Sequence, residues 1–216
     1  IKEKIAEGEI YQVNLCRVLT TDCDQSLLGL AGRLQQANPA PYASYLKLPN
    51  LEIASASPEL FLERNGKQIK STPIKGTATS SVFGEKDKAE NVMIVDLVRN
   101  DLSKISKIGS VKVDRLFQVD SYQTIHHLSS EISGIMLEEC NIFNAIIACF
   151  PPGSMTGAPK IKAIEASNSF EKIARGIYSG TIGIIKSKDE AVFSVVIRTL
   201  ILQNNNFEFQ VGGAIN

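Results

Sequence analysis

A lysine inside an apolar segment is the first residue of this sequence whose type and setting could do chemistry. Lys75 follows Ile74 and precedes Gly76 and Thr77. Burial penalises a charged ammonium and lowers its pKa, so a lysine in such a segment can supply a neutral amine nucleophile. The backbone N–H groups of Gly76 and Thr77 could hold an anion beside it. Taken alone, the same lysine also fits a solvated turn.

Two glutamates could complement that amine. Glu59 stands at the start of the apolar run Leu60-Phe61, where partial burial would raise its pKa and allow it to act as a general acid. Glu90 lies on a predicted helix, and its carboxylate suits a hard cation such as Mg²⁺. The alternatives are a turn carboxylate for Glu59 and an exposed helix-face residue for Glu90.

Histidine, arginine and glycine supply further candidates. His126 and His127 are neighbours in a predicted strand, where adjacent side chains face opposite ways, so only one of them could line a site. Arg198 lies in a β-branched strand, and its burial would require a carboxylate, either from the protein or from a ligand. Gly212 and Gly213 would let backbone approach a ligand closely, or would simply turn the chain.

The segment 152–160 is rich in proline and glycine and could be compared with a phosphate-binding loop. It lacks the spacing of one, because Pro159 stands where a glycine should precede Lys160. What remains is a glycine loop leading into a helix N-terminus, an end that favours carboxylates. Tyr178, between Gly176 and Gly180, completes the candidate set.

The elements that position these residues follow from hydrophobic periodicity and turn residues. Helices are predicted at 1–7, 27–37, 87–103, 140–149 and 159–167. Strands are predicted at 10–19, 42–48, 51–57, 60–64, 67–71, 109–119 and 122–134, with three more between 176 and 212. Because strands outnumber helices and arrive in hairpin series, the prediction is an α+β fold of antiparallel sheets flanked by helices.

The composition narrows the class of protein. At 216 residues, 44% hydrophobic and 21% charged, the chain suits one globular domain. Its 23 basic and 23 acidic residues balance, so no overall field attracts nucleic acid or a membrane surface. The four cysteines lack zinc-site spacing, which predicts buried thiols in a reducing cytoplasm. The first residues read as the middle of a helix, so we expect a fragment of a longer protein.

A series of segments along residues 1–216 resembles, in order, the motifs of the chorismate-utilising enzymes. They are IYQVNL, SPELFL, PIKGT, ENVMIVDLVRNDL, HLSS, PGSMTGAPKIKAIE, RGIYSG, VIRT and VGGAI. Two positions narrow the resemblance. Gln12 stands where the isochorismate and salicylate synthases have a lysine that activates water, and Lys75 stands where anthranilate synthases usually have alanine. The pattern is therefore most similar to component I of the aminodeoxychorismate synthases.

The resemblance implies a fold, a reaction and a set of roles. The fold is part of a sandwich of antiparallel sheets between helical layers. Lys75 would attack chorismate at C2 while the C4 hydroxyl leaves, protonated by Glu59, and ammonia would then add at C4 and expel the lysine. His127 would line the ring. The remaining implied contacts are Mg²⁺ at Glu90, the enolpyruvyl carboxylate at Tyr178 and Arg198, and backbone or hydroxyl contacts from Gly76, Thr77, Gly212 and Gly213.

The sequence also departs from the family pattern. The arginine usual after PIKGT is missing near Ser80 and Ser81. By the resemblance, a second magnesium-binding glutamate would lie on a helix beyond Asn216, and an N-terminal subdomain would precede Ile1. A separate glutamine amidotransferase would deliver the ammonia. The alternatives are anthranilate synthase component I and a catalytically silent relative.

Overall fold

The computed structural model describes residues 1–216 except Asp24, Gln123 and Thr124. The helices are α1 (Lys2–Ala6), α2 (Leu28–Ala37), α3 (Glu85–Ser103), α4 (Ile142–Cys149), α5 (Gly153–Thr156) and α6 (Lys160–Phe170). The first strands are β1 (Gln12–Asp22), β2 (Tyr42–Leu48), β3 (Leu51–Ser57), β4 (Leu60–Asn65), β5 (Gln68–Thr72), β6 (Ile74–Ala78), β7 (Lys112–Ser121) and β8 (His126–Ile135). The later strands are β9 (Gly157–Ala158), β10 (Thr181–Ser187), β11 (Glu190–Val195), β12 (Thr199–Gln203) and β13 (Asn206–Ile215).

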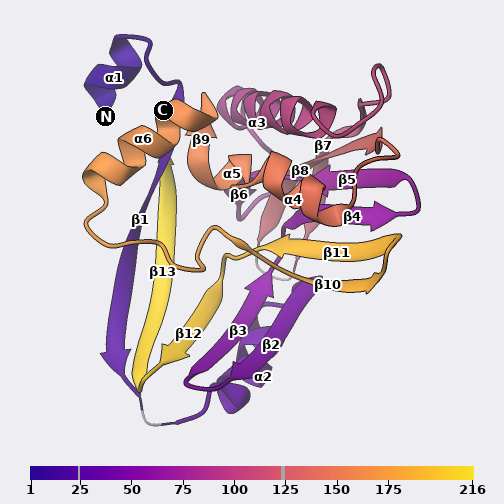
Figure 1. Ribbon diagram of the computed structural model, residues 1–216. Helices are drawn as coiled ribbons and strands as arrows, with labels where there is room; N and C mark the ends of the chain where they lie inside the picture. Colours follow the sequence, from indigo (N-terminus) through magenta and orange to yellow (C-terminus); the bar gives the residue numbers. More distant parts are fainter. Residues whose placement is uncertain (24, 123–124) are drawn as a thin grey trace.

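The strands form two antiparallel sheets (Figure 1). The first sheet has the order β2-β3-β12-β13-β1-β9. The second sheet has the order β10-β11-β4-β5-β8-β6, and β7 also pairs with β8. Within this architecture, the predicted α+β fold of antiparallel sheets with helices is confirmed.

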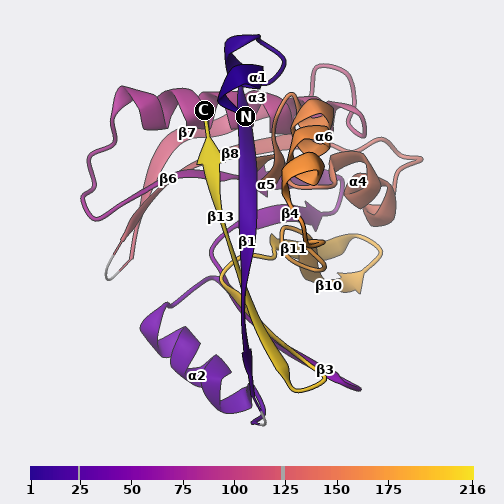
Figure 2. The same ribbon diagram turned by 90° about the vertical axis from the view of Figure 1, so that its left-hand side faces the viewer.

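The helices cover the sheets unevenly. α3 packs on β6 and β8, α6 on β1, and α2 on β3. The view in Figure 2 separates α2 from the group formed by α3, α4 and α6. The face of α3 that meets the second sheet carries Ile94, Val98 and Leu102 at helical spacing, all buried. Each such side chain stabilises the fold by about 1.5–3 kcal/mol on burial.

The end of the chain differs from the prediction of three strands between 176 and 212. The structure has four strands there, because the segment 190–203 is broken after Val195 into β11 of the second sheet and β12 of the first. The break falls where the backbone of Arg198 adopts a left-handed φ of 49°. A β-branched run gives no sign of such a break, since propensity does not report a change of sheet.

Three other elements were not predicted. One of them is β9, a two-residue strand that pairs with β1. β6 is a separate strand just after β5, although the two are parted only by Pro73, and it pairs with β8. The expected loop before Gly157 contains the single helical turn α5. The predicted strand 122–134 corresponds to β8, but its residues 123–124 lie outside the described residues.

The cysteine prediction was correct in part. All four cysteines are free thiols, but only Cys149 of the four is buried. Among the described residues, no helix is long and apolar enough to cross a membrane.

Candidate active site

A cleft of about 540 Å³ opens between the two sheets. It is lined by residues of β1 and β13 from the first sheet and of β6 and β8 from the second, together with α3 and α5. All the site residues predicted from the sequence line it: Glu59, Lys75, Gly76, Thr77, Glu90, His127, Tyr178, Arg198, Gly212 and Gly213. Residues up to 154 positions apart in the chain thus meet in one space.

The cleft forms where the chain passes between the sheets. Glu59 lies in the crossing from β3 to β4, and Arg198 lies in the crossing from β11 to β12. Backbone hydrogen bonds join the two crossings, from Val195 N to Glu59 O at 3.0 Å and from Ala56 N to Arg198 O at 3.1 Å. The two charged side chains therefore reach the cleft from neighbouring, mutually fixed backbone.

Glu59 is a buried acid with a raised pKa. Only 3% of the residue is exposed. Burial raises the pKa of its carboxyl to about 7, against the opposing effects of a Ser154 hydrogen bond and the positive charges of Lys75 and Arg198. A carboxyl with such a pKa holds a proton near neutrality and can give it to a leaving group.

Lys75 lines the same cleft. Burial lowers the pKa of its ammonium, and the negative charges of Glu59 and Glu90 act in the opposite direction. The structure thus contradicts the alternative of a solvated turn lysine. An amine whose charged form is disfavoured, next to a carboxyl whose neutral form is favoured, is a nucleophile and proton donor pair.

His127 is held at both ring nitrogens. Its Nδ1 lies 2.9 Å from Thr77 Oγ1, and its Nε2 lies 2.8 Å from a guanidinium nitrogen of Arg198. Because a guanidinium only donates, Nε2 accepts, and the ring is neutral with its proton on Nδ1. Burial, with the charge of Arg198, lowers the pKa of His127 to about 4, which agrees with a neutral ring.

The prediction that Arg198 lies within a strand was wrong, because it lies between β11 and β12. Its burial was expected to require a carboxylate from the protein or from a ligand. Its side-chain hydrogen-bond partner among the described residues is His127, so the protein does not supply that carboxylate there. Burial lowers the pKa of Arg198, yet the guanidinium stays charged, so an anionic ligand in the cleft would satisfy it.

Two glycines are required by the close packing of this cleft. A Cβ on Gly212 would lie 2.6 Å from the Tyr178 hydroxyl and 2.9 Å from Asn14 Nδ2. Gly76 has a φ of 101°, and a Cβ there would press on Leu128 and Phe83. Gly213, in contrast, would meet nothing within 4 Å. Gly212 therefore keeps the backbone of β13 close to two polar groups that face the cleft.

Glu90 is the predicted metal ligand. Its Oε2 accepts a hydrogen bond from Gln12 Nε2 at 3.2 Å, and its Oε1 accepts one from Asn216 Nδ2 at 2.6 Å. The buried Gln12 Oε1 has no partner among the described residues. No group of three or more acidic, histidine or cysteine side chains that could hold a metal occurs in the described part of the chain. Because Mg²⁺ keeps several waters and uses one or two carboxylates, Glu90 fits it as one ligand of an incomplete set.

Sequence reasoning missed four polar residues of the cleft: Asn14, Asp87, Ser154 and Gln210. Asp87 could have been found, since it precedes Glu90 by one helical turn on α3. Asn14 and Ser154 lie in the matched motifs IYQVNL and PGSMTGAPK but carry no signal of their own. From the Pro-Gly segment only Ser154 and Met155 line the cleft; the N-terminus of α6 does not.

Comparison with known proteins finds one family that matches the whole chain. A family model described as chorismate binding enzyme matches residues 1–216. An aminodeoxychorismate synthase of Streptomyces griseus is 38% identical over 99% of this chain and 32% of that protein. An anthranilate synthase component 1 of Haloarcula marismortui is 36% identical over 100% of this chain and 47% of that protein.

A solved structure of a related enzyme has the same fold as this chain. The crystal structure of anthranilate synthase component I from Streptococcus pneumoniae superposes with a TM-score of 0.91 and 29% identity, over 99% of this chain and 50% of that one. The chain thus spans about a third to a half of the length of these relatives.

Proposed function

Because the chain belongs to the family of chorismate binding enzymes, we propose that it carries the catalytic residues for amination of chorismate at C4, giving 4-amino-4-deoxychorismate. This is the reaction of aminodeoxychorismate synthase component I, on the way to para-aminobenzoate and folate. The observation that carries the proposal is the presence of Lys75 and Glu59 in one cleft, an amine and a carboxyl whose pKa values burial shifts toward the neutral form of each group.

The reaction proceeds in two displacements. The Lys75 amine forms a bond to ring C2, the double bond shifts, and the C4 hydroxyl leaves as water with a proton from Glu59. Ammonia then adds at C4, the double bond shifts back, and the C2–nitrogen bond to Lys75 breaks. Lysine is regenerated, and the nitrogen remains at C4.

The other cleft residues bind and orient the substrate. Arg198 and Tyr178 bind the enolpyruvyl carboxylate. His127 fixes the guanidinium of Arg198 and lines the ring. Gly76, Thr77, Gly212 and Gly213 contribute backbone or hydroxyl contacts. Glu90 would hold Mg²⁺ in part, and the bound ion would neutralise the ring carboxylate.

Ammonia comes from a separate glutamine amidotransferase subunit. The four free thiols fit a reducing compartment such as the cytoplasm.

The test uses the full-length protein with chorismate, Mg²⁺ and ammonia, and identifies the product by mass. We expect 4-amino-4-deoxychorismate. Formation of anthranilate would instead support anthranilate synthase component I, the alternative that the Haloarcula relative favours. Binding of chorismate without turnover would indicate a catalytically silent relative.

The role of Lys75 has its own test. Lys75→Ala removes the nucleophile, so we expect the covalent adduct to disappear from the intact-protein mass spectrum and kcat/KM to fall by roughly 10⁴-fold or more. Lys70→Ala, on β5 and in an ion pair with Glu63, is the matched control because Lys70 does not line the cleft. The same adduct on the Lys75→Ala protein would rule out Lys75 as the nucleophile.

A further inference from the structure

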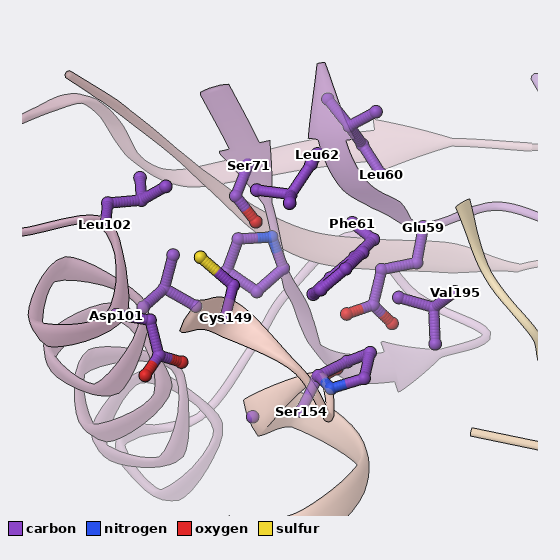
Figure 3. A pocket seen from close by; sticks show the side chains of 14 residues that line it. Glu59, Leu60, Phe61, Leu62, Ser71, Asp101, Leu102, Cys149, Ser154 and Val195 are labelled. Carbon is purple, nitrogen blue, oxygen red and sulfur yellow. The ribbon is translucent and has the colours of Figure 1, made fainter. Parts of the chain in front are cut away.

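A second, much smaller cavity lies beside Glu59. Its volume is about 20 Å³. Of the residues that line it, only Glu59 and Ser154 also line the cleft. These two residues therefore lie between a large space and a small one. Figure 3 shows the Glu59 carboxylate at the edge of this cavity, with Phe61 and Val195 beside it.

The cavity is the size of one water molecule. A space must offer about 10–15 Å³ to a water and must present two to four polar partners. Much of the wall is apolar, from Phe61, Leu102 and Val195 among others. Ser71 on β5 and Ser154 on α5 bring hydroxyl groups to it, and Glu59 brings a carboxyl.

The other polar groups of the wall are already engaged or neutral. Asp101 forms ion pairs with Lys104 and Lys160. Burial raises the pKa of the Cys149 thiol to about 12, so it stays protonated. Ser71 is buried, and it lines the cavity together with Glu59 and Ser154. A water in the cavity would give its hydroxyl a hydrogen-bond partner.

We infer that Ser154 is a positioning residue for the proton donor, and that one water enclosed between Glu59, Ser71 and Ser154 completes the hydrogen bonding of that carboxyl. The acid role of Glu59 rests on the proposed function, but the water and the hydrogen bonds do not. Ser154 and the water occupy acceptor positions of the carboxyl on the cavity side. Its O–H is thereby left to point into the cleft, toward a leaving group.

Charged groups act on Glu59 from every side. Lys75 on β6 and Arg198 between β11 and β12 act from the cleft, and the N–H of Ile74 donates a hydrogen bond. Asp101 on α3 and Cys149 on α4 face it across the cavity. Ser154 stabilises the ionised carboxylate by donating to it, so loss of its hydroxyl raises the pKa of Glu59 further.

The first experiment titrates the Glu59 carboxyl by ¹³C NMR in the full-length protein without substrate. For Ser154→Ala we expect its pKa to rise by about one unit, because a hydrogen bond to a charged group is worth about that much. Ser133→Ala, which removes another buried hydroxyl that bonds Asp114 on a distant strand pair, should leave it unchanged. An unchanged pKa in Ser154→Ala would overturn the inference.

The second experiment looks for the water in a high-resolution crystal structure of the full-length protein. We expect one peak within hydrogen-bond distance of Glu59, Ser71 and Ser154, and its loss in Ser71→Val, where an added methyl fills the space. If that variant does not fold, Ser71→Ala should weaken the peak by removing one partner. A cavity without density in the unsubstituted protein would overturn the inference.

Neither measurement needs turnover. A protein that shows the pKa shift and the water but makes no 4-amino-4-deoxychorismate would refute the proposed function alone. A protein that makes the product without either would refute the present inference alone.

Discussion

Two glutamates at opposite ends of β3 show how differently one chain can treat a buried carboxylate. Glu52, near the start of the strand, accepts hydrogen bonds from Ser26 Oγ and Leu27 N, both at 2.7 Å, and from Tyr45 Oη at 2.9 Å. It also pairs with Lys47 at 3.0 Å. These donors lower the pKa of Glu52 to about 2. Burial raises the pKa of Glu59, just past the other end, to about 7.

The difference lies in burial and in the donors that reach each carboxylate. Glu52 is 11% exposed at its side chain, and four donors hold it in the ionised form. Its bond to Leu27 N lies at the start of α2 and fastens that helix to β3. Glu59 is 3% exposed, and the effect of its burial outweighs that of its fewer donors. Burial and donors together therefore decide which form of a carboxylate is favoured.

The largest expected effect is on activity, and it distinguishes Glu59 from Glu52. Glu59→Gln keeps the size of the side chain but removes the transferable proton, so kcat/KM should fall by about 10²–10⁴-fold. Glu52→Gln should leave kcat/KM of the folded protein nearly unchanged. Both are measured on full-length protein, with circular dichroism to establish folding. Equal losses in the two variants would erase the distinction.

A smaller effect appears in the pH dependence of kcat/KM. Glu59 must be protonated, and its protonated fraction falls about tenfold per unit once the pH rises above about 7. Lys75 must be neutral, and its neutral fraction falls as the pH drops below the lowered pKa of that amine. The profile should therefore be bell-shaped, with limbs set by these two groups, and it should be the same in Glu52→Gln. A shift of the alkaline limb of this profile in Glu52→Gln would show that the charge of Glu52 affects the pKa of Glu59.

The smallest effect is on stability, and it has opposite signs at the two ends. The folded-state pKa of Glu59 lies above its ordinary value of 4.5, so its unfavourable contribution to stability grows as the pH rises from 4.5 to about 7. Glu59→Gln should therefore stabilise the protein near pH 8 by about 1–3 kcal/mol. The folded-state pKa of Glu52 lies below 4.5, so its contribution is present above 4.5 and is lost as the pH falls toward 2.

Denaturant titration at several pH values measures both contributions. Glu52→Gln should lower the denaturant midpoint of unfolding at neutral pH. In acid, the midpoints of the variant and the unsubstituted protein should become equal. A stabilised Glu52→Gln, or a destabilised Glu59→Gln near pH 8, would reverse the assignment of the two ends.

The sequence predicted the composition of the cleft better than its geometry. Each candidate from Glu59 to Gly213 lines the same space, because the matched motifs carry the polar residues that face it. What the sequence could not predict is the change of sheet at Arg198 and its bond to His127, since both depend on strand pairing across more than 70 residues. The boundaries of long periodic elements such as α3 were within two residues.

The sequence also could not predict the difference in pKa between the two glutamates. Both stand beside short apolar runs and look alike in the sequence. The partners of Glu52 come from residues 26, 27, 45 and 47, while those of Glu59 come from residues 74 and 154. A carboxylate whose environment is assembled from distant segments cannot be assigned a pKa from its neighbours in the chain.

The paired backbone bonds between the two crossings also govern how this protein can move. The backbone of Val195 is hydrogen-bonded to that of Glu59, and the backbone of Ala56 to that of Arg198. The Glu59 carboxyl and the Arg198 guanidinium are therefore carried by one hydrogen-bonded unit of backbone between the sheets. Any rocking of one sheet against the other displaces both groups together and alters their distance from residues on β6 and β13. Movement of a distant sheet edge would thus change the positions of both groups in the candidate site.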